Sequence, residues 1–394
     1  MTGKIELFKF TRYTMILSGI WRLEINASRW VRRLYITYSI ATQIIFDISI
    51  FMFNMEFAHL FRVDIEQAIE NLSRMIFVLL LIAKFSICQT KGMQVLIKQA
   101  LDGETKIIAT DNSKIRSIYE MHAWYCQVLI VSITVASFVL SAYLSEIGIE
   151  ESYKFHREPR SLNESREDPF PVALWYPFNR NKYFIVVMCH QTLEICLTGF
   201  YSTAVNAITN SVLIYMRARL KILQHNLENF ATHRTENCAK GGDHALYSLK
   251  MFSKLHQELI QWTVELNGNF KHLIFLEYGV SSLLLAAVIF QIFAGIKVVF
   301  NYIYFGLISC QLMALAWNAN EVAIESENLA TALYNSKWYH ESLQTRVILQ
   351  IMMVRCQRQL TISIGPFGAL NTEAVLSRFK LAYSYVSVMS SGSV

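Results

Sequence analysis

The residues that could do chemistry in this chain lie inside strongly apolar stretches. Cys189 and His190 are adjacent, and Glu194 follows His190 by four residues, so a helix would place His190 and Glu194 on one face. A metal site needs three or four converging ligands, and no third ligand is evident. The sequence also contains no nucleotide-binding loop, no HExxH motif and no GxSxG motif. We therefore expect no metal, no cofactor and no enzymatic activity.

Four ionisable residues, Asp47, Lys84, Glu194 and Glu277, interrupt the apolar stretches. Charged groups are costly inside a membrane and are candidates for function. Lys84 and Glu277 lie near the ends of their stretches, where a long side chain can reach the interface. Asp47 and Glu194 lie deeper, where hydrogen bonding within a helical bundle would satisfy them. A proton-coupled transporter would pair such groups at matched helix breaks, and no internal repeat is evident.

Seven apolar stretches must position these side chains, at roughly residues 31–54, 67–89, 121–145, 183–206, 272–296, 299–320 and 343–391. A helix crosses the hydrocarbon core with about 20 apolar residues. The last stretch is too long for one crossing, and its Gly365-Pro366 pair breaks it. A hydrophobic content of 53% and a mean hydropathy of +0.30 leave little room for a soluble domain. The predicted fold is an all-α membrane protein with seven transmembrane helices, the last one broken near Gly365-Pro366.

Lysine and arginine are concentrated before the first stretch, between the second and third, and between the fourth and fifth. Positive residues flank the cytoplasmic ends of membrane helices, so the N-terminus is predicted in the cytoplasm and the C-terminus outside. The net charge of +6 reflects this topology, and no nucleic-acid partner is expected.

A single domain is predicted over residues 1–394, with four distinctive segments. Residues 1–30 contain an interfacial helix, 146–182 form a proline-rich extracellular lid, and 217–271 form amphipathic cytoplasmic anchor helices. Residues 370–391 form a helix rich in serine, which needs protein or water beside it. Lining a pore between subunits and packing within one subunit would both meet that need.

Several short motifs occur in an order and spacing that together are fairly specific. They are Trp175–Phe178 (WYPF), Gln191, Asn335–Tyr339 (NSKWY), Leu360-Thr361-Ile362 and Phe379–Tyr385 (FKLAYSY). On these residues the chain resembles the insect odorant receptor family over essentially its whole length. The resemblance implies an odorant-gated, non-selective cation channel in the plasma membrane of olfactory sensory neurons. It also implies a heterotetramer with the co-receptor Orco, and a small volatile ligand, membrane lipid and permeant cations as further partners.

The resemblance places this chain among the odorant-tuning subunits of the family. The connection between the fourth and fifth stretches lacks the long insertion of the co-receptor, and the C-terminus reads SVMSSGSV. The alternatives from other classes are a G-protein-coupled receptor and a solute transporter. The predicted cytoplasmic N-terminus and the absence of DRY and NPxxY motifs argue against the first, and the absence of repeats argues against the second.

The resemblance also implies where the sites lie. It makes 370–391 the pore helix, with Leu381, Tyr385, Val388 and Ser391 at the pore and Val388 as a hydrophobic constriction that gates by dewetting. The odorant pocket is expected in the outer half of the membrane, among the second, third, fourth and sixth spans. The residues expected at that depth are Met75, Leu79, Ser137, Phe138, Ser141, Tyr143, Met188, Thr192, Tyr302, Phe305 and Ile308.

Overall fold

The computed structural model describes residues 5–21, 28–157, 170–180, 182–230 and 244–391. Within these residues the α-helices are α1 (Lys9–Leu17), α2 (Arg29–Val63), α3 (Ile65–Cys88), α4 (Lys91–Ile108), α5 (Ser113–Arg157), α6 (Phe184–Glu228), α7 (His244–Phe293), α8 (Val298–Asn335), α9 (Leu343–Cys356) and α10 (Thr372–Ser391). Two short 3-10 helices, η1 (Trp338–His340) and η2 (Gly365–Phe367), complete the set. The predicted all-α class is confirmed.

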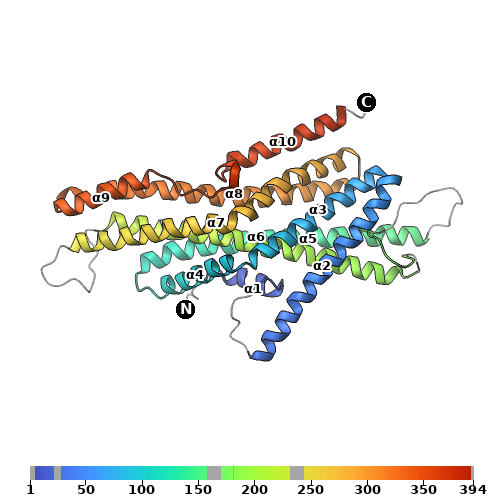
Figure 1. The fold of residues 1–394 in the computed structure, drawn as a ribbon, viewed down its shortest axis with the longest axis horizontal. Helices are drawn as coiled ribbons and strands as arrows, with labels where there is room; N and C mark the ends of the chain where they lie inside the picture. Colours follow the sequence, from blue (N-terminus) through green and yellow to red (C-terminus); the bar gives the residue numbers. More distant parts are fainter. Residues whose placement is uncertain (1–4, 22–27, 158–169, 181, 231–243, 392–394) are drawn as a thin grey trace.

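Six of these helices, α2, α3, α5, α6, α7 and α8, are long and apolar enough to cross a membrane. Each covers all or nearly all of one of the first six predicted stretches, and most extend well beyond it. The seventh predicted span corresponds to α10, which is 20 residues long and has a larger fraction of serine than the other six helices. Figure 1 shows α10 at one edge of the bundle, beside α7 and α8.

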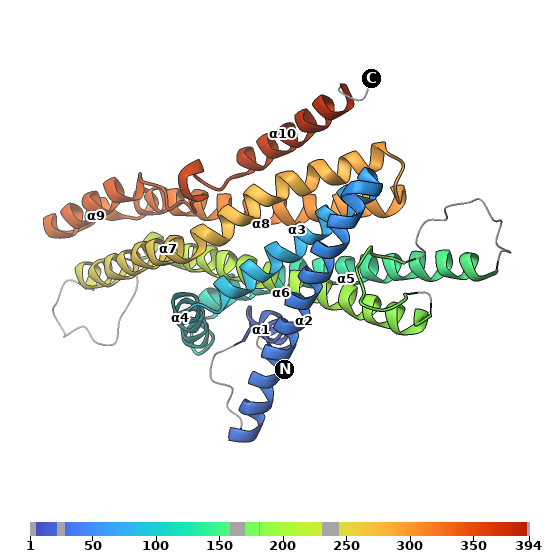
Figure 2. The ribbon, with the colours of Figure 1, turned by 45° about the vertical axis from the view of Figure 1, so that its right-hand side comes forward.

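The helices pack into two regions. The larger hydrophobic core runs through α3, α5, α6, α7 and α8 and also includes residues of α1, α2, α4 and α10. A second core lies at the other end of the long helices, where the C-terminal parts of α6 and α8 pack with the N-terminal part of α7 and with α9. We call this second region the anchor, and the opposite end, which carries residues 170–180, the lid end (Figures 1 and 2).

The anchor contains the predicted amphipathic helices of 217–271, which are the end of α6 and the start of α7. Their apolar faces are buried on one another and on α9. Basic residues of α6 form an ion network with α8, in which Arg217 lies 2.6 Å from Glu321 and Lys221 lies 2.8 Å from Glu325. Gln224 donates a further hydrogen bond to the Glu325 carboxylate.

The N-terminal segment lies against the bundle. Leu7 and Phe8 are buried, and the Phe8 ring is 5.7 Å from that of Tyr215 on α6. The backbone N–H of Leu7 donates to the buried carboxylate of Glu104 on α4, which also accepts from Tyr119. Trp21 is buried as well, so this segment contributes more to the core than the predicted interfacial helix would. Helix α4 was not expected from the sequence, since only every third or fourth of its residues is apolar and buried.

The last predicted stretch breaks earlier than the glycine and proline residues suggest. Helix α9 ends at Cys356, and an extended segment follows in which Leu360, Ile362 and Ile364 are buried while Thr361 is exposed. This alternation is typical of an extended chain and not of a helix. Side chains of α7 and α8 satisfy its backbone, because Ser326 accepts from Leu360 N–H at 2.8 Å and Asn267 accepts from Ser363 N–H at 2.9 Å.

The loop predicted at 146–182 is shorter in the structure. Helix α5 continues to Arg157 because residues 146–157 include good helix formers and the first proline comes only at Pro159. Residues 158–169, which include Pro159 and Pro169 of the predicted proline-rich lid, lie outside the described residues. Residues 170–180 follow as an irregular segment across the lid end.

Candidate functional site: a cavity beneath the lid

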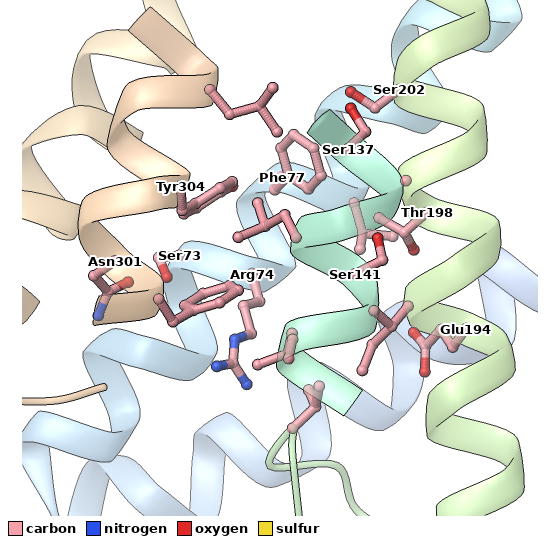
Figure 3. A pocket seen from close by; sticks show the side chains of 18 of the residues that line it. Ser73, Arg74, Phe77, Ser137, Ser141, Glu194, Thr198, Ser202, Asn301 and Tyr304 are labelled. Atoms are coloured by element: carbon pink, nitrogen blue, oxygen red, sulfur yellow. The ribbon is translucent and has the colours of Figure 1, made fainter. Parts of the chain in front are cut away.

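A cavity of about 120 Å³ lies at the lid end of the bundle, between α3, α5, α6 and α8. Each helix presents side chains spaced by three or four residues, which is the spacing of one helix face. The lining residues are Ser73, Arg74, Phe77 and Val78 from α3; Ser137, Leu140, Ser141 and Leu144 from α5; Glu194, Ile195, Thr198, Gly199 and Ser202 from α6; Phe300, Asn301, Tyr304 and Leu307 from α8; and Phe53, Val172 and Gln291 from other elements. Figure 3 shows the polar members of this set around the space.

The wall between α3 and α8 is aromatic. The Phe77 ring meets the Tyr304 ring edge-on at 6.1 Å, and Phe300 stacks on Tyr304 at 5.8 Å. The wall between α5 and α6 carries hydroxyl groups instead, from Ser137, Ser141, Thr198 and Ser202. The cavity therefore combines aromatic surface on α3 and α8, beside the polar residues Ser73, Arg74 and Asn301, with hydroxyl groups on α5 and α6, a mixture that is usual for small-molecule sites.

The lid closes the cavity through its backbone. The Gln191 side chain, on α6, donates to the carbonyl of Val172 at 2.9 Å and accepts from the N–H of the same residue at 3.2 Å. Asn71 donates to the carbonyl of Ala173 at 2.6 Å, and the N–H of Trp175 donates to the carbonyl of Met52 at 3.3 Å. Val172 and Leu174 are buried as a result, and Val172 lines the cavity as part of its roof.

Charged groups tie the lid to the helix ends. Arg74 donates to the carbonyl of Pro171 at 2.7 Å and pairs with Glu70, one turn earlier on α3. Glu70 also lies 3.1 Å from the amine of Lys297, a residue that adopts a left-handed conformation with φ of 39° at the start of α8. Arg180 reaches Glu56 on α2 at 3.4 Å. These contacts join the lid to α2, α3 and the start of α8 at the mouth of the cavity.

The aromatic part of the lid is also engaged. The Tyr176 hydroxyl shares a hydrogen bond of 2.9 Å with Nδ1 of His190 on α6. Burial raises the pKa of Tyr176 to about 12, so the phenol is neutral at physiological pH. Nδ1 of His190 is thus engaged in a hydrogen bond with a tyrosine, and Cys189 is exposed on another face of α6. Among the described residues, no three histidine, cysteine or acidic side chains are grouped as a metal site.

Two of the expected pocket residues, Ser137 and Ser141, line the cavity. Met75, Met188 and Ile308 are buried in the packing of the bundle, and Tyr143, Thr192 and Phe305 are partly buried beside it. Leu79, Phe138 and Tyr302 face outward, with exposed fractions of 43%, 42% and 60%. The cavity lies among the four expected spans, but on α3 and α8 the residues that line it stand one or two positions from the expected ones. The polar residues that interrupt those helices, Arg74 and Asn301, mark the inward face.

Of the expected pore residues, Leu381 is partly buried on α10. Tyr385, Val388 and Ser391 follow on the same helix, and their side chains lie outside the described part of the chain. Helix α10 is held near its start, where the Phe379 ring lies 6.4 Å from that of Phe305 on α8. Arg378 lies over the ring of Tyr278 on α7 at 5.2 Å.

Lys84 and Glu277, which were expected to reach the membrane interface separately, instead form an ion pair with each other. Lys84 lies on α3 and Glu277 on α7, and their side chains are only 4% and 11% exposed. A buried pair of this kind ties the two helices together two turns below the cavity-lining part of α3. The two residues lie 193 positions apart along the chain, so no local sequence pattern predicts that they pair.

Comparison with known proteins identifies the fold and the relatives. The model of the 7tm Odorant receptor family matches residues 64–383. Odorant receptor 10 of Aedes albopictus is 28% identical over 184 residues, which are 45% of this chain and 48% of that protein. Odorant receptor Or2 of Anopheles gambiae is 26% identical over 218 residues, or 52% of this chain and 54% of that protein. The matches thus span about half the length of these relatives.

The fold is similar to that of a solved receptor. The insect olfactory receptor OR5 from Machilis hrabei, in complex with eugenol, superposes with a TM-score of 0.80 at 16% identity, covering 97% of this chain and 96% of that one. A second solved structure of the same receptor gives a TM-score of 0.79 at 17% identity. At this identity the likeness establishes the fold.

Proposed function

The chain belongs to the seven-transmembrane odorant receptor family, and from that membership we propose that it is the odorant-tuning subunit of a ligand-gated cation channel. It would act in the plasma membrane of olfactory sensory neurons, in a heterotetramer with the co-receptor Orco. A small volatile compound would bind beneath the lid, and displacement of α10 would open the pore to cations. The family consists of receptors rather than enzymes. Membership in it argues against the solute transporter alternative, and a cytoplasmic N-terminus would distinguish the chain from a G-protein-coupled receptor.

The observation that carries this proposal is the cavity beneath the lid. Its volume of about 120 Å³ is close to that of cavities known to hold a single aromatic ring, about 150 Å³. It is lined mainly by apolar side chains, with a few polar groups that could orient a ligand. The similar Machilis receptor was solved in complex with eugenol, which supports an organic ligand for this chain as well.

A pore role for α10 is supported by its composition and position. It has the largest fraction of serine among the long helices and packs mainly against α7 and α8. Leu381, Tyr385, Val388 and Ser391 are spaced by three or four residues, so they occupy one stripe of this helix. In a tetramer, the same stripe from each subunit could face the central axis.

The direct test of the proposed function is current recording in cells that express the chain with and without the co-receptor. We expect a broad panel of odorants to evoke a cation current when both are present and little current from this chain alone. The co-receptor expressed alone is the matched control for the same odorants. Full odorant responses without the co-receptor would contradict the tuning-subunit assignment, and silence with it would contradict the receptor assignment.

The proposed orientation makes a separate prediction. The anchor and the N-terminal segment carry the basic residues that favour the cytoplasmic side. An epitope tag at the C-terminus should therefore be stained by antibody on intact cells, and a tag at the N-terminus should be stained only after permeabilisation. The reverse pattern would overturn the orientation, and with it the outward placement of the lid and cavity.

The pore stripe predicts the effect of a charge at Val388. We expect Val388→Lys to reduce the odorant-evoked current at least about tenfold or to change cation permeability ratios, because a charged ring is a barrier in a narrow pore. Surface expression should persist. The neighbouring substitution Met389→Leu, off the stripe, is the control and should leave the current unchanged. If Met389→Leu altered permeability while Val388→Lys did not, the assigned stripe would be wrong.

A further inference from the structure

Helix α10 begins at a short hairpin that is fixed to α7. Residues 362–370 fold back on themselves around η2, and the N–H of Ile364 donates to the carbonyl of Gly368 at 2.8 Å. Gly368 has a φ of 95°, a conformation that favours glycine. On α7, the side chain of Asn267 donates to the carbonyl of Thr361 at 2.8 Å. The hairpin therefore gives α10 a defined starting point beside α7.

One basic side chain of α10 lies against the rings of this region. The guanidinium of Arg378 lies 5.2 Å from the centre of the Tyr278 ring on α7 and 5.6 Å from the centre of the Phe367 ring at the tip of the hairpin. Phe367 in turn stacks on Phe275 of α7, with ring centres 5.8 Å apart and an angle of 9° between the planes. We call this cluster the clamp; its members are Arg378, Tyr278, Phe367 and Phe275. The clamp connects three segments of the chain, which are α7, the hairpin and α10.

The clamp holds its cation without an anion. Charged residues inside membrane helices are usually paired with an opposite charge or with backbone carbonyls. The Nε atom of Arg378 is buried without a hydrogen-bond partner, and Glu277, the acid next to Tyr278, is paired with Lys84. In the part of the chain that the structure describes, no acidic side chain forms an ion pair with Arg378. The ring faces therefore supply the attraction, which is modest beside that of a buried ion pair. A contact of this strength can hold a helix and still be released.

The clamp lies at the base of the stripe expected at the pore. Arg378 precedes Leu381 by three positions, so it begins the stripe that continues through Tyr385 and Val388. Val388 lies about 15 Å beyond Arg378 along the helix, at a rise of about 1.5 Å per residue. A tilt of α10 about the hairpin is therefore larger at Val388 than at the clamp. Because the helix is rigid, contacts at its base control that tilt.

We propose that Arg378 is a positioning residue of the gate: the clamp holds α10 against α7 and the hairpin, and it must release before α10 is displaced and the pore opens. The strength of the clamp then sets the amount of odorant that opening requires. Without the clamp, α10 reaches its displaced arrangement more easily, so the channel opens more often without odorant and at lower odorant concentration. This inference rests on the proposed function and concerns the regulation of the same channel.

Replacing Arg378 with glutamine tests the proposal in cells that express the full chain with the co-receptor. We expect Arg378→Gln to raise the basal current, as a fraction of the current at saturating odorant, and to lower the half-maximal odorant concentration, each about tenfold. Arg378→Lys keeps the charge without the flat guanidinium and should give a smaller shift in the same direction. Lys380→Gln removes the same charge from the exposed side of α10 and should change neither quantity. A variant that only destabilised the protein would reduce the total current and would not raise basal opening.

The aromatic members of the clamp give an independent test. Phe367 is 62% exposed, so Phe367→Leu removes one ring without opening a cavity in the core. It should shift both quantities in the same direction as Arg378→Gln, by about threefold, because the Tyr278 ring remains. The double variant of Arg378→Gln with Phe367→Leu should match Arg378→Gln alone, since the ring acts through the arginine. Tyr278→Phe keeps the ring and should behave as the wild type.

Three results at normal surface expression would overturn the proposal. They are a reduced or unchanged sensitivity in Arg378→Gln, an equal shift in Lys380→Gln, and additive shifts from Arg378→Gln and Phe367→Leu. If Arg378→Gln does not reach the cell surface, Arg378→Lys and Phe367→Leu decide the question by the same two measurements. A wild-type receptor that stays silent towards a broad odorant panel with the co-receptor counts instead against the proposed function, and with it against the gate that Arg378 positions.

Discussion

Replacing Lys84 with methionine is expected to destabilise the receptor by about 3–5 kcal/mol, because it leaves the Glu277 carboxylate buried without its partner. The reciprocal variant Glu277→Gln should have a comparable effect, since it leaves the lysine unpaired. Helices α3 and α7 pack closely along their length. Because α3 lines the cavity and α7 contacts α10, the lost stability falls on the contact between these two parts of the receptor. Thermal denaturation of the purified full-length receptor, together with its level at the cell surface, measures the effect.

The double variant Lys84→Met with Glu277→Met distinguishes a lost partner from lost packing. Removing both charges together should restore much of the stability, because two apolar side chains of similar size need no compensation inside the bundle. Lys271→Met is the matched control: Lys271 is exposed on α7 before Glu277, and the change should cost little. A single variant as stable as the wild type, or a double variant no better than either single one, would contradict the ion-pair account.

The membrane helices could be predicted from the sequence because their signal is local. A run of about 20 apolar residues has few outcomes other than a membrane helix or a buried one. An ordered loop at this end could also be expected from the sequence, since four of the five prolines fall in one loop beside an aromatic cluster. Helix α4 was missed because an amphipathic helix of 18 residues gives no such run. The end of α9 at Cys356 could not be predicted, because the alternation of buried and exposed residues over Leu360–Ile364 is short. The nearby glycine-proline pair is a stronger helix-breaking signal.

The candidate site was less predictable because it depends on rotation of helices about their axes. Tyr302 and Tyr304 are two residues apart on α8, yet one is 60% exposed and the other lines the cavity. From the sequence alone, both tyrosines are expected at the same depth in the membrane. The inward face of each helix is better predicted from the polar residues Arg74, Glu194 and Asn301 than from the aromatic residues, because a polar group in a membrane helix faces the protein interior. The Lys84–Glu277 pair required knowledge of which helices are neighbours, which no local pattern supplies.

A second large effect on odorant sensitivity is expected from a substitution at Thr198, in the cavity wall. Its side chain lines the cavity on α6, one turn from Glu194 and Ser202 (Figure 3). Thr198→Phe would place a ring in a space of about 120 Å³, which leaves little room for a ligand of similar size. The protein should still fold, because the added ring gains contacts with the apolar wall and fills a void.

We expect Thr198→Phe to raise the half-maximal odorant concentration about 100-fold or to abolish the response, because a ligand must displace the new ring at an overpacking cost of about 1–3 kcal/mol. Thr198→Val removes only the hydroxyl group and keeps the shape, so it should change the concentration much less. Leu193→Phe adds the same ring to the outward face of α6, where Leu193 is 55% exposed, and should leave odorant responses intact. Dose-response curves for the three variants with the co-receptor, normalised to surface expression, separate these outcomes. Unchanged sensitivity in Thr198→Phe, or equal losses in Thr198→Phe and Leu193→Phe, would move the odorant site away from the cavity beneath the lid.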